Sequence, residues 1–301
     1  YILPRILTRS MFLLRRLAYI KRHLSSFVQS CPKPTYDTGC THCQIPEFPQ
    51  DKQINFEHNL NGTSSIPWKH VLVLLHGVAN FDEMASKINL IPGSLALDFE
   101  VLKRNSLSAL HPVTLSNALI SGGSHEDDKK THRVRVYPDN VEVQFSRDHV
   151  QQFMEHYLLP EEAPQEVYNP FVTRQALSKV RRSHDGLFQE EKPGKDLVLI
   201  CGHTQRDIRC GLLAPLIQRE FQKVLQRENL TENVDVGLIS HIGGHAYAGN
   251  VIYFPADSQR MPVTWYGRVF PENVQGIVQA TIKEGKIIKS MFRGVVEHEK
   301  V

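Results

Sequence analysis

The hydrophobic pattern of the C-terminal third of the chain alternates between runs of strand length and runs with helical spacing. One apolar run ends on Cys201, helical spacing follows to about residue 228, and a second apolar run ends just before His241. Two further runs can pair as a hairpin, and a glycine ends the helix after them. The order strand, helix, strand, loop, strand, strand, helix is that of the thioredoxin fold after its first helix is omitted or moved. The predicted strands and last helix are DLVLIC (196–201), NVDVGLIS (233–240), NVIYFP (250–255), PVTWYGRV (262–269) and ENVQGIVQATIKEG (272–285).

The N-terminal part of the pattern also predicts both strands and helices. Prolines and charges between residues 161 and 195 break up any long element, so we place a domain boundary near residue 194. The sequence thus predicts an α/β protein with a smaller or degenerate α/β domain over residues 31–194, including a cysteine-rich loop and the linker, and a second domain over residues 195–301. Strands are predicted at KHVLVLLHG (69–77), HRVRVYP (132–138) and VEVQF (141–145), and helices at NFDEMASKI (80–88) and RDHVQQFMEHYLL (147–159).

The first thirty residues contain no acidic residue, and the first one along the chain is Asp37. Arginines and lysines stand among leucine, isoleucine and phenylalanine, and serines follow, which is typical of an amphipathic mitochondrial presequence. The segment keeps the composition of a presequence if translation starts at Met11. A secretory signal is excluded because basic residues interrupt the apolar core, and an ordinary basic terminus is the alternative. The sequence predicts a presequence over residues 1–30 and a mitochondrial location, in the matrix or the intermembrane space.

Outside this leader the chain is close to neutral, because much of the positive charge behind the formal net value of +3 lies at the N-terminus. No basic stripe with interleaved aromatic residues occurs, so we expect no nucleic-acid partner. No run of about 20 apolar residues occurs, which excludes a transmembrane segment by length. Hydrophobic residues make up 41% of the chain, an average value for globular proteins, so wholesale disorder is not expected.

Two pairs of candidate metal ligands follow two of the predicted strands. Cys201 and Cys210 have eight residues between them, and His241 and His245 flank a Gly-Gly pair that allows a tight turn. Functional loops of α/β sheets cluster at the carboxyl ends of parallel strands. Two cysteines and two histidines suit zinc, but structural zinc sites usually space their cysteines by roughly two to four residues. The longer loop here suits a [2Fe–2S] cluster better than a single ion.

Two thiolates neutralise the charge of an oxidised [2Fe–2S] core, so its reduction potential should lie above that of an all-cysteine ferredoxin, as in Rieske centres. Each imidazole ligand keeps a second nitrogen that can bind a proton, so reduction should depend on pH. His203, Arg206 and Asp207 are candidates for surrounding groups that tune the site, with simple hydration of a loop as the alternative. Rieske domains interleave their ligands as C-x-H and C-x-x-H, whereas both cysteines come first here, which excludes a Rieske domain by motif.

The spaced cysteines and the H-x-G-G-H motif are accompanied by RDIRCG, AGNVIYFP, WYGRVFP and FRG. This combination resembles the sucrase/ferredoxin-like family, and more closely its fungal mitochondrial members, the altered-inheritance-of-mitochondria thioredoxin-like ferredoxins. The resemblance extends over nearly the whole chain after the leader. It implies that the domain over residues 195–301 is a thioredoxin-like ferredoxin domain, and that the protein is an electron carrier with a redox partner protein rather than an enzyme with its own substrate. The ligands that it implies for a [2Fe–2S] cluster are Cys201, Cys210, His241 and His245, with both histidines on one iron as a working hypothesis by analogy with Rieske centres.

Cys40 and Cys43 form a separate C-x-x-C motif, with Cys31 nearby. An odd and sparse set of cysteines does not fit a secreted disulfide framework. A thiol–disulfide oxidoreductase that uses Cys40 and Cys43 is one alternative function, although thioredoxin motifs lie between a strand and a helix and this one lies in a proline-rich loop. A zinc-binding structural module is the other alternative. No G-x-S-x-G motif occurs, so a hydrolase is not expected.

Overall fold

The computed structural model describes residues 26–39, 46–75, 81–107, 110–121, 131–161 and 186–296. The strands of these residues are β1 (Phe27–Val28), β2 (Lys69–Leu74), β3 (Val113–Ile120), β4 (Thr131–Tyr137), β5 (Val141–Ser146), β6 (Phe188–Glu191), β7 (Asp196–Cys201), β8 (Val234–Ile239), β9 (Val251–Phe254), β10 (Val263–Tyr266), β11 (Ile287–Ile288) and β12 (Phe292–Val296). The helices are α2 (Leu95–Ser106), α3 (Val150–Tyr157), α4 (Ile208–Arg227) and α5 (Val274–Ile277), which a π-helical turn continues over Val278–Lys283.

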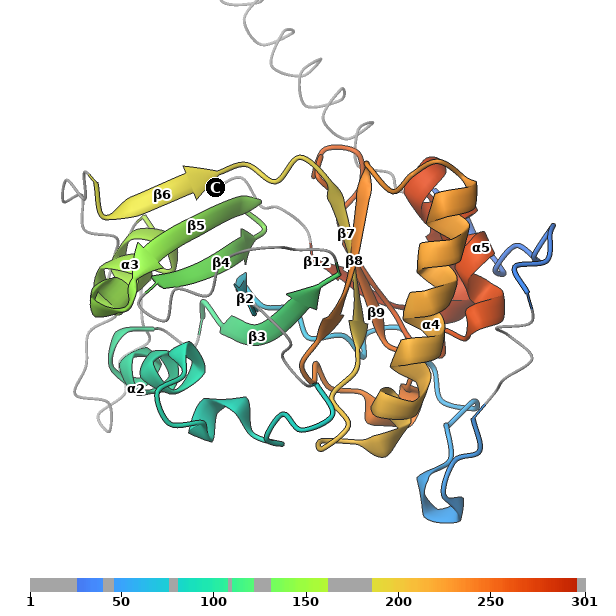
Figure 1. Cartoon of the computed structure of the whole chain (residues 1–301), viewed down its shortest axis with the longest axis horizontal. Helices are drawn as coiled ribbons and strands as arrows, with labels where there is room; N and C mark the ends of the chain where they lie inside the picture. The colour runs from blue at the N-terminus through green and yellow to red at the C-terminus, as the bar shows by residue number, and fades with distance from the viewer. Residues whose placement is uncertain are drawn as a thin grey trace, which may run out of the picture.

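A mixed sheet of ten strands runs through the molecule in the order β12-β10-β9-β7-β8-β3-β2-β4-β5-β6 (Figure 1). In its C-terminal part, β7 is parallel to β8 and antiparallel to β9, and β9 is antiparallel to β10. Helices α4 and α5 lie together along one side of these strands (Figure 1). This mixed arrangement is consistent with a thioredoxin-like α/β fold, and the predicted fold class is confirmed.

The centre of this half is β7, because all of its residues are buried, as expected of a strand covered on both faces. Helix α4 begins at Asp207, whose side chain accepts a hydrogen bond from the Arg209 backbone N–H as an N-cap. The apolar positions of α4 then face the sheet at helical spacing. The buried apolar residues of this helix include Leu213, Ile217, Phe221, Val224 and Leu225. The strand end and the helix start that carry the two cysteines are thus fixed by packing.

The N-terminal half adds β2 to β6, and α2 and α3 cover one face of them (Figure 1). The N-terminal half has an apolar core of its own, whose buried residues all lie between Val71 and Leu158. The core of the C-terminal half is built mainly from Leu197 and later residues. The sheet nevertheless continues from one half to the other, since β3 of the N-terminal half pairs with β8 of the C-terminal half. Gly237 makes this pairing fit, because a Cβ there would lie 3.0 Å from Ile120 Cα. The domain boundary near residue 194 stays a prediction.

Most of the predicted elements are present, and one helix is wrong. Residues 81–87 form turns rather than the helix predicted over 80–88, and α2 begins later, where Ser94 caps it by accepting from the Leu97 N–H. The earlier segment is held by contacts with the other half instead, since Thr204 and Gln205 donate hydrogen bonds to Asp82. Helix α2 and the strands β1, β3, β6, β11 and β12 are additions that the pattern did not predict.

The last residues of the predicted leader and those just after it lie against the C-terminal half. Phe27 and Val28 pair in parallel with Ile287 and Ile288, and the Cys31 thiol donates to the Asn273 carbonyl. Burial raises the pKa of the Cys31 thiol to about 11, so this thiol is unreactive at neutral pH. Residues 1–25 of the predicted presequence lie outside the described residues, and so do the two cysteines of the C-x-x-C motif, Cys40 and Cys43.

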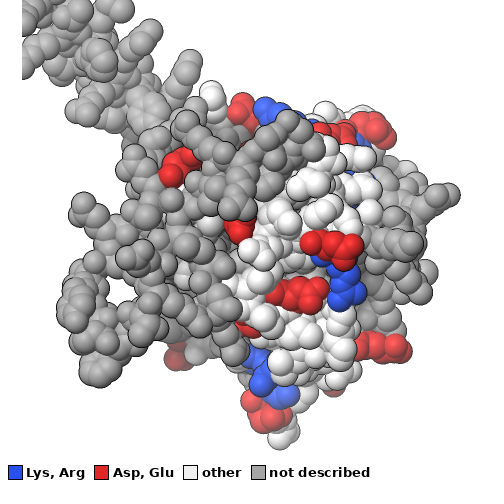
Figure 2. Space-filling view, turned by 90° about the vertical axis from the view of Figure 1, so that its left-hand side faces the viewer, with Lys and Arg blue, Asp and Glu red and all other residues white. Residues whose placement is uncertain are grey.

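The charged side chains on one face of the described residues are of both signs (Figure 2). On the face in Figure 2, acidic and basic side chains stand side by side among the coloured residues, and these residues form no extended basic area. None of the helices in the described part of the chain has the length and apolar character needed to cross a membrane. The absence of a nucleic-acid partner stays a prediction.

A buried histidine in β2 gives the fold a testable pH dependence. Burial lowers the pKa of His70 to about 4, and its ring lies beside Trp265 with Nε2 3.0 Å from Ser116 Oγ. The pKa of an unfolded histidine is about 6.5, so the unfolded chain binds more protons between these values and stability falls as the pH drops through this window. We expect a loss of up to about 3 kcal/mol in the free energy of unfolding. Urea unfolding of His70→Gln should show a smaller loss between about pH 7 and about pH 4; an equal loss in both proteins would contradict the assignment.

Candidate metal centre

The two cysteines of the candidate site lie at the junction between β7 and α4. Cys201 is the last residue of β7 and Cys210 lies in the first turn of α4, and both are buried. The Cys201 N–H donates to the Asn250 carbonyl, and the Cys210 N–H donates to the Asp207 carbonyl. A strand-to-helix junction of this kind is where thioredoxin-like proteins carry their redox cysteines. The wide spacing in the sequence therefore becomes a short distance in the fold.

His241 completes a compact group with these cysteines. It follows β8, and its Nδ1 lies 3.9 Å from Cys201 Sγ. One donor atom each from Cys201, Cys210 and His241 lie within 4.8 Å of one another. His245 lies beside them, with its ring 5.7 Å from that of His241, but it is exposed and is not part of the compact group. The structure thus brings three of the four predicted ligands together and places the fourth at the surface next to them; their role as ligands stays a prediction.

The two thiols differ in acidity because they share one hydrogen bond. The interaction between the two thiols lowers the pKa of Cys201 well below its usual value, and His241 and the Ile242 N–H add to this effect. The same hydrogen bond and burial raise the pKa of Cys210. One proton therefore leaves readily and the second is retained. A metal cation can replace this second proton, because metal binding and thiol deprotonation are coupled.

His203 holds the histidine loop in place. It is 1% exposed, its Nδ1 accepts from the His241 N–H at 3.2 Å, and its Nε2 lies 3.1 Å from both the Met84 and the Ala85 carbonyls. Because Nε2 can only donate to carbonyls, the proton is on Nε2 and Nδ1 is free to accept. His203 therefore connects the backbone of a predicted ligand to the N-terminal half of the chain.

The other two predicted tuning residues have different places. The Asp207 carboxylate caps α4 and pairs with the Arg209 guanidinium, which holds the pKa of Asp207 below its usual value although burial opposes this. The Arg209 guanidinium also donates to the Gln53 carbonyl. Arg206 is exposed and lines a surface pocket beside His203 and His241. Asp207 thus fixes the turn that carries Cys210, whereas Arg206 borders the site from outside.

Removing the His203 imidazole should destabilise the protein. The His203→Ala variant leaves the His241 N–H and two carbonyls without their buried partner, and a loss of this kind costs about 1–3 kcal/mol for each unsatisfied group. We expect a decrease of about 2 kcal/mol or more in the free energy of unfolding, measured with urea. Arg206→Ala is the matched control, since its exposed side chain should change stability little. Equal stability of the two variants would show that His203 does not fix the loop.

Two residues of the site were not predicted as functional. Arg293 and Asn250 are both buried next to the histidine loop, where the Arg293 guanidinium donates to the Asn250 side chain. Both belong to motifs that carry the family resemblance, FRG and AGN, but a motif does not show which side chain turns inward. An arginine inside the apolar strand β12 is the signal that could have identified one of them, because unpaired charges are rarely buried.

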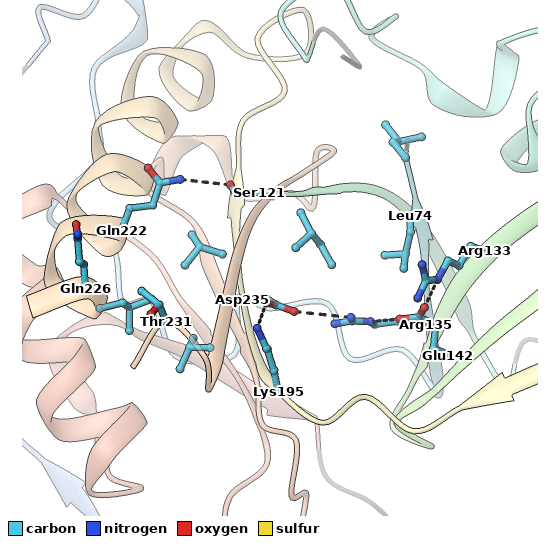
Figure 3. Close-up of a pocket in the computed structure, with 15 residues that line it drawn as sticks. Leu74, Ser121, Arg133, Arg135, Glu142, Lys195, Gln222, Gln226, Thr231 and Asp235 are labelled. Carbon is cyan, nitrogen blue, oxygen red and sulfur yellow. Dashed lines mark hydrogen bonds and ion pairs between the residues drawn. The ribbon is translucent and has the colours of Figure 1, made fainter. Parts of the chain in front are cut away.

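A second cavity lies between α4 and the strands β4 and β5 (Figure 3). Its charged side chains are paired with one another, since Arg133 and Arg135 both contact Glu142, and Lys195 lies 3.6 Å from Asp235. Among the residues that the structure describes, no cysteine or histidine lines it. Lys195 precedes β7 whereas Cys201 ends it, so the charged end of the cavity at Lys195 lies about 20 Å from the cysteines along the strand. It therefore has no part in the candidate metal centre.

The fold and the site together define a thioredoxin-like α/β protein in which two buried cysteines at a strand-to-helix junction and one half-buried histidine form a compact group. The profile of the family described as Sucrase/ferredoxin-like matches residues 60–294, and the chain belongs to this family.

Curated relatives cover nearly the whole chain. It is 56% identical over 278 residues to the "Altered inheritance of mitochondria protein 32" of Clavispora lusitaniae, a match that covers 91% of this chain and 97% of the relative. Proteins of the same name from Meyerozyma guilliermondii and Debaryomyces hansenii are both 48% identical, over 282 and 280 residues, and each match covers 92% of this chain and 98% of the relative. The predicted family membership is thereby confirmed.

Proposed function

We propose that this protein is an electron carrier that holds a [2Fe–2S] cluster through Cys201, Cys210, His241 and His245. The observation that supports this most strongly is the compact group formed by the first three of these residues, in which both cysteines are buried. The ferredoxin-like description of the family favours a redox centre. The name of the relatives and the basic leader support a mitochondrial site of action, in the matrix or the intermembrane space.

The residues around the site fit a cluster of low charge. Thiolates are the usual ligands of iron–sulfur clusters, and two histidines replace two cysteines in Rieske centres. The Ile242 N–H points at the Cys201 sulfur, and N–H groups near sulfur ligands are one means by which proteins adjust the potential of such clusters. Cys201 and Cys210 are both buried, which protects a cluster from solvent. The donor set and its surroundings therefore fit the proposed group.

The chain's own groups suggest how electrons and protons are handled. When bound, the cluster supplies one-electron chemistry. The cysteines form the buried side of the site, and His245 is exposed, so the histidine side is where a redox partner protein can approach. His241 turns its Nδ1 toward Cys201. Its Nε2 is then the atom that binds or releases a proton, which links reduction to pH.

A single zinc ion is the second candidate, and the compactness of the site favours it. Donor atoms within 4.8 Å of one another suit the tetrahedral geometry of one ion. Iron, acid-labile sulfide and zinc analysis of protein purified without oxygen separates the two. We expect two irons and two sulfides for each chain. One zinc for each chain without sulfide would overturn the electron-carrier proposal.

A further inference from the structure

Arg293 lies directly behind the loop that joins the two candidate histidine ligands. It comes from β12, is 1% exposed, and its Nη1 donates to the Gly243 carbonyl at 3.3 Å and to Asn250 Oδ1 at 2.7 Å. Its Nε and Nη2 donate to the hydroxyl and the carbonyl of Thr63 at 3.1 and 2.5 Å. The guanidinium is therefore fixed in position from several sides.

The partners of this guanidinium carry no charge. All its hydrogen-bond acceptors are amide, carbonyl or hydroxyl oxygens, and within the part of the chain that the structure describes no aspartate or glutamate pairs with it. Burial lowers the pKa of Arg293, and the thiolates of Cys201 and Cys210 act against this by attraction. A buried cation without a counter-charge is strongly unfavourable. The nearest source of negative charge is therefore the pair of thiolates of Cys201 and Cys210 in the candidate metal centre.

Arg293 also acts on the backbone between the histidines. The side chain of Asn250, which it contacts, donates to the Gly244 carbonyl at 2.9 Å, and the Asn250 carbonyl accepts from the Cys201 N–H at 2.9 Å. The carbonyls of both glycines in the H-x-G-G-H motif are thus bound, one by Arg293 and one by Asn250. The position of this loop relative to Cys201 therefore depends on the side chains of Arg293 and Asn250.

The two glycines of the motif are not equivalent. Both have left-handed backbone conformations, with φ of +82° at Gly243 and +74° at Gly244. A Cβ on Gly243 would meet nothing within 4 Å, whereas a Cβ on Gly244 would lie 2.7 Å from Arg293 Cζ. Gly243 is therefore required for its conformation alone, and Gly244 is required to leave room for the guanidinium as well.

We propose that Arg293 is the fixed buried cation that raises the reduction potential of the centre and the positioning residue of the His241–His245 loop. The effect on the potential rests on the proposed function, because it requires a redox-active centre. Reduction adds negative charge, and a nearby buried cation stabilises the reduced state more than the oxidised state. The effect on the loop depends on hydrogen bonds and packing alone.

The first test compares the midpoint potentials of the purified full-length protein and its Arg293→Gln and Arg293→Lys variants. Loss of the charge in Arg293→Gln should decrease the equilibrium constant of reduction about tenfold, which is about 59 mV for a one-electron couple. Arg293→Lys keeps the charge but not the planar donor geometry, so its potential should stay near that of the unchanged protein. Arg147→Gln, an exposed arginine paired with Asp98, is the control and should leave the potential unchanged. A wild-type potential in Arg293→Gln, or equal decreases in both Arg293 variants, would overturn the electrostatic role.

The second test needs no metal and compares Gly243→Ala with Gly244→Ala by urea unfolding of the metal-free protein. Both replacements place a side chain on a residue with a similar positive φ, so the difference between them reports mainly the displacement of Arg293. We expect the decrease in stability to be at least about twice as large for Gly244→Ala. Equal decreases would overturn the positioning role. This test does not use Arg293→Gln, so it decides the question even if that variant does not fold. A wild-type protein without iron would contradict the proposed function and the electrostatic role together, whereas the glycine pair would still decide the positioning role.

Discussion

Replacing Cys201 or Cys210 by serine is expected to abolish iron binding. Both thiols are buried and face the same small volume, so no other cysteine of the described residues can take their place. The serine hydroxyl is nearly the same size but is a poor ligand for iron–sulfur clusters, which select soft thiolates. Loss of a residue that merely supports a ligand costs about 10–100-fold in metal affinity, and loss of a ligand costs more. The iron content and the visible absorption of either variant should fall to background.

Cys31→Ser is the matched control for this prediction. The Cys31 thiol is partly buried and donates to the Asn273 carbonyl, and it is absent from the compact donor group. A serine hydroxyl can make the same hydrogen bond, so this variant should keep its full iron content. Iron retained in Cys201→Ser or Cys210→Ser at the level of Cys31→Ser would remove that cysteine from the site.

Replacing His241 or His245 by cysteine is expected to keep a cluster but to lower its potential. A third thiolate makes the centre more negative, which disfavours the addition of an electron. Exchange of two cysteines for two histidines separates plant-type ferredoxins from Rieske centres by at least about 250 mV, so one exchange should shift the potential by on the order of 100 mV. The variant also loses one imidazole nitrogen that can bind a proton, so the potential should vary less with pH.

Spectroelectrochemical titration at several pH values measures both effects. His149→Cys places a new thiol in the N-terminal half, just before α3, and serves as the control, whose potential should equal that of the unchanged protein. His245 is the more informative position, because it is exposed and lies outside the compact donor group. A His245→Cys variant with an unchanged potential and pH dependence would show that His245 is not a ligand.

The sequence was most informative where local pattern and long-range packing agree. The apolar run that ends on Cys201 is buried on both faces in the sheet, so its strand could be predicted from composition alone. The position of Cys210 at the start of a helix could also be predicted, because Asp207 is a strong N-cap residue and the apolar positions after it have helical spacing. The turn of the histidine loop was also predictable, since Gly243 and Gly244 both adopt positive φ.

The sequence was least informative where tertiary contacts override local preference. The segment over 81–87 has the composition of a helix, but its carbonyls and side chains bind the loop that contains His203 and Thr204. The pairing of β3 with β8 joins residues far apart in the chain, and only a glycine at residue 237 hints at it. The inward position of Arg293 depends on its contacts with Thr63, Gly243 and Asn250, which no local pattern describes.

Pulsed EPR spectroscopy of the reduced, anaerobically purified protein is the most direct test of the central claim that two cysteines and two histidines hold a [2Fe–2S] cluster. The account predicts a signal from a reduced cluster with magnetic couplings to two imidazole nitrogens, one of which disappears in His241→Cys and the other in His245→Cys. A cluster signal without nitrogen coupling would contradict the histidine ligands. A protein without any such signal that contains one zinc for each chain would contradict the cluster itself.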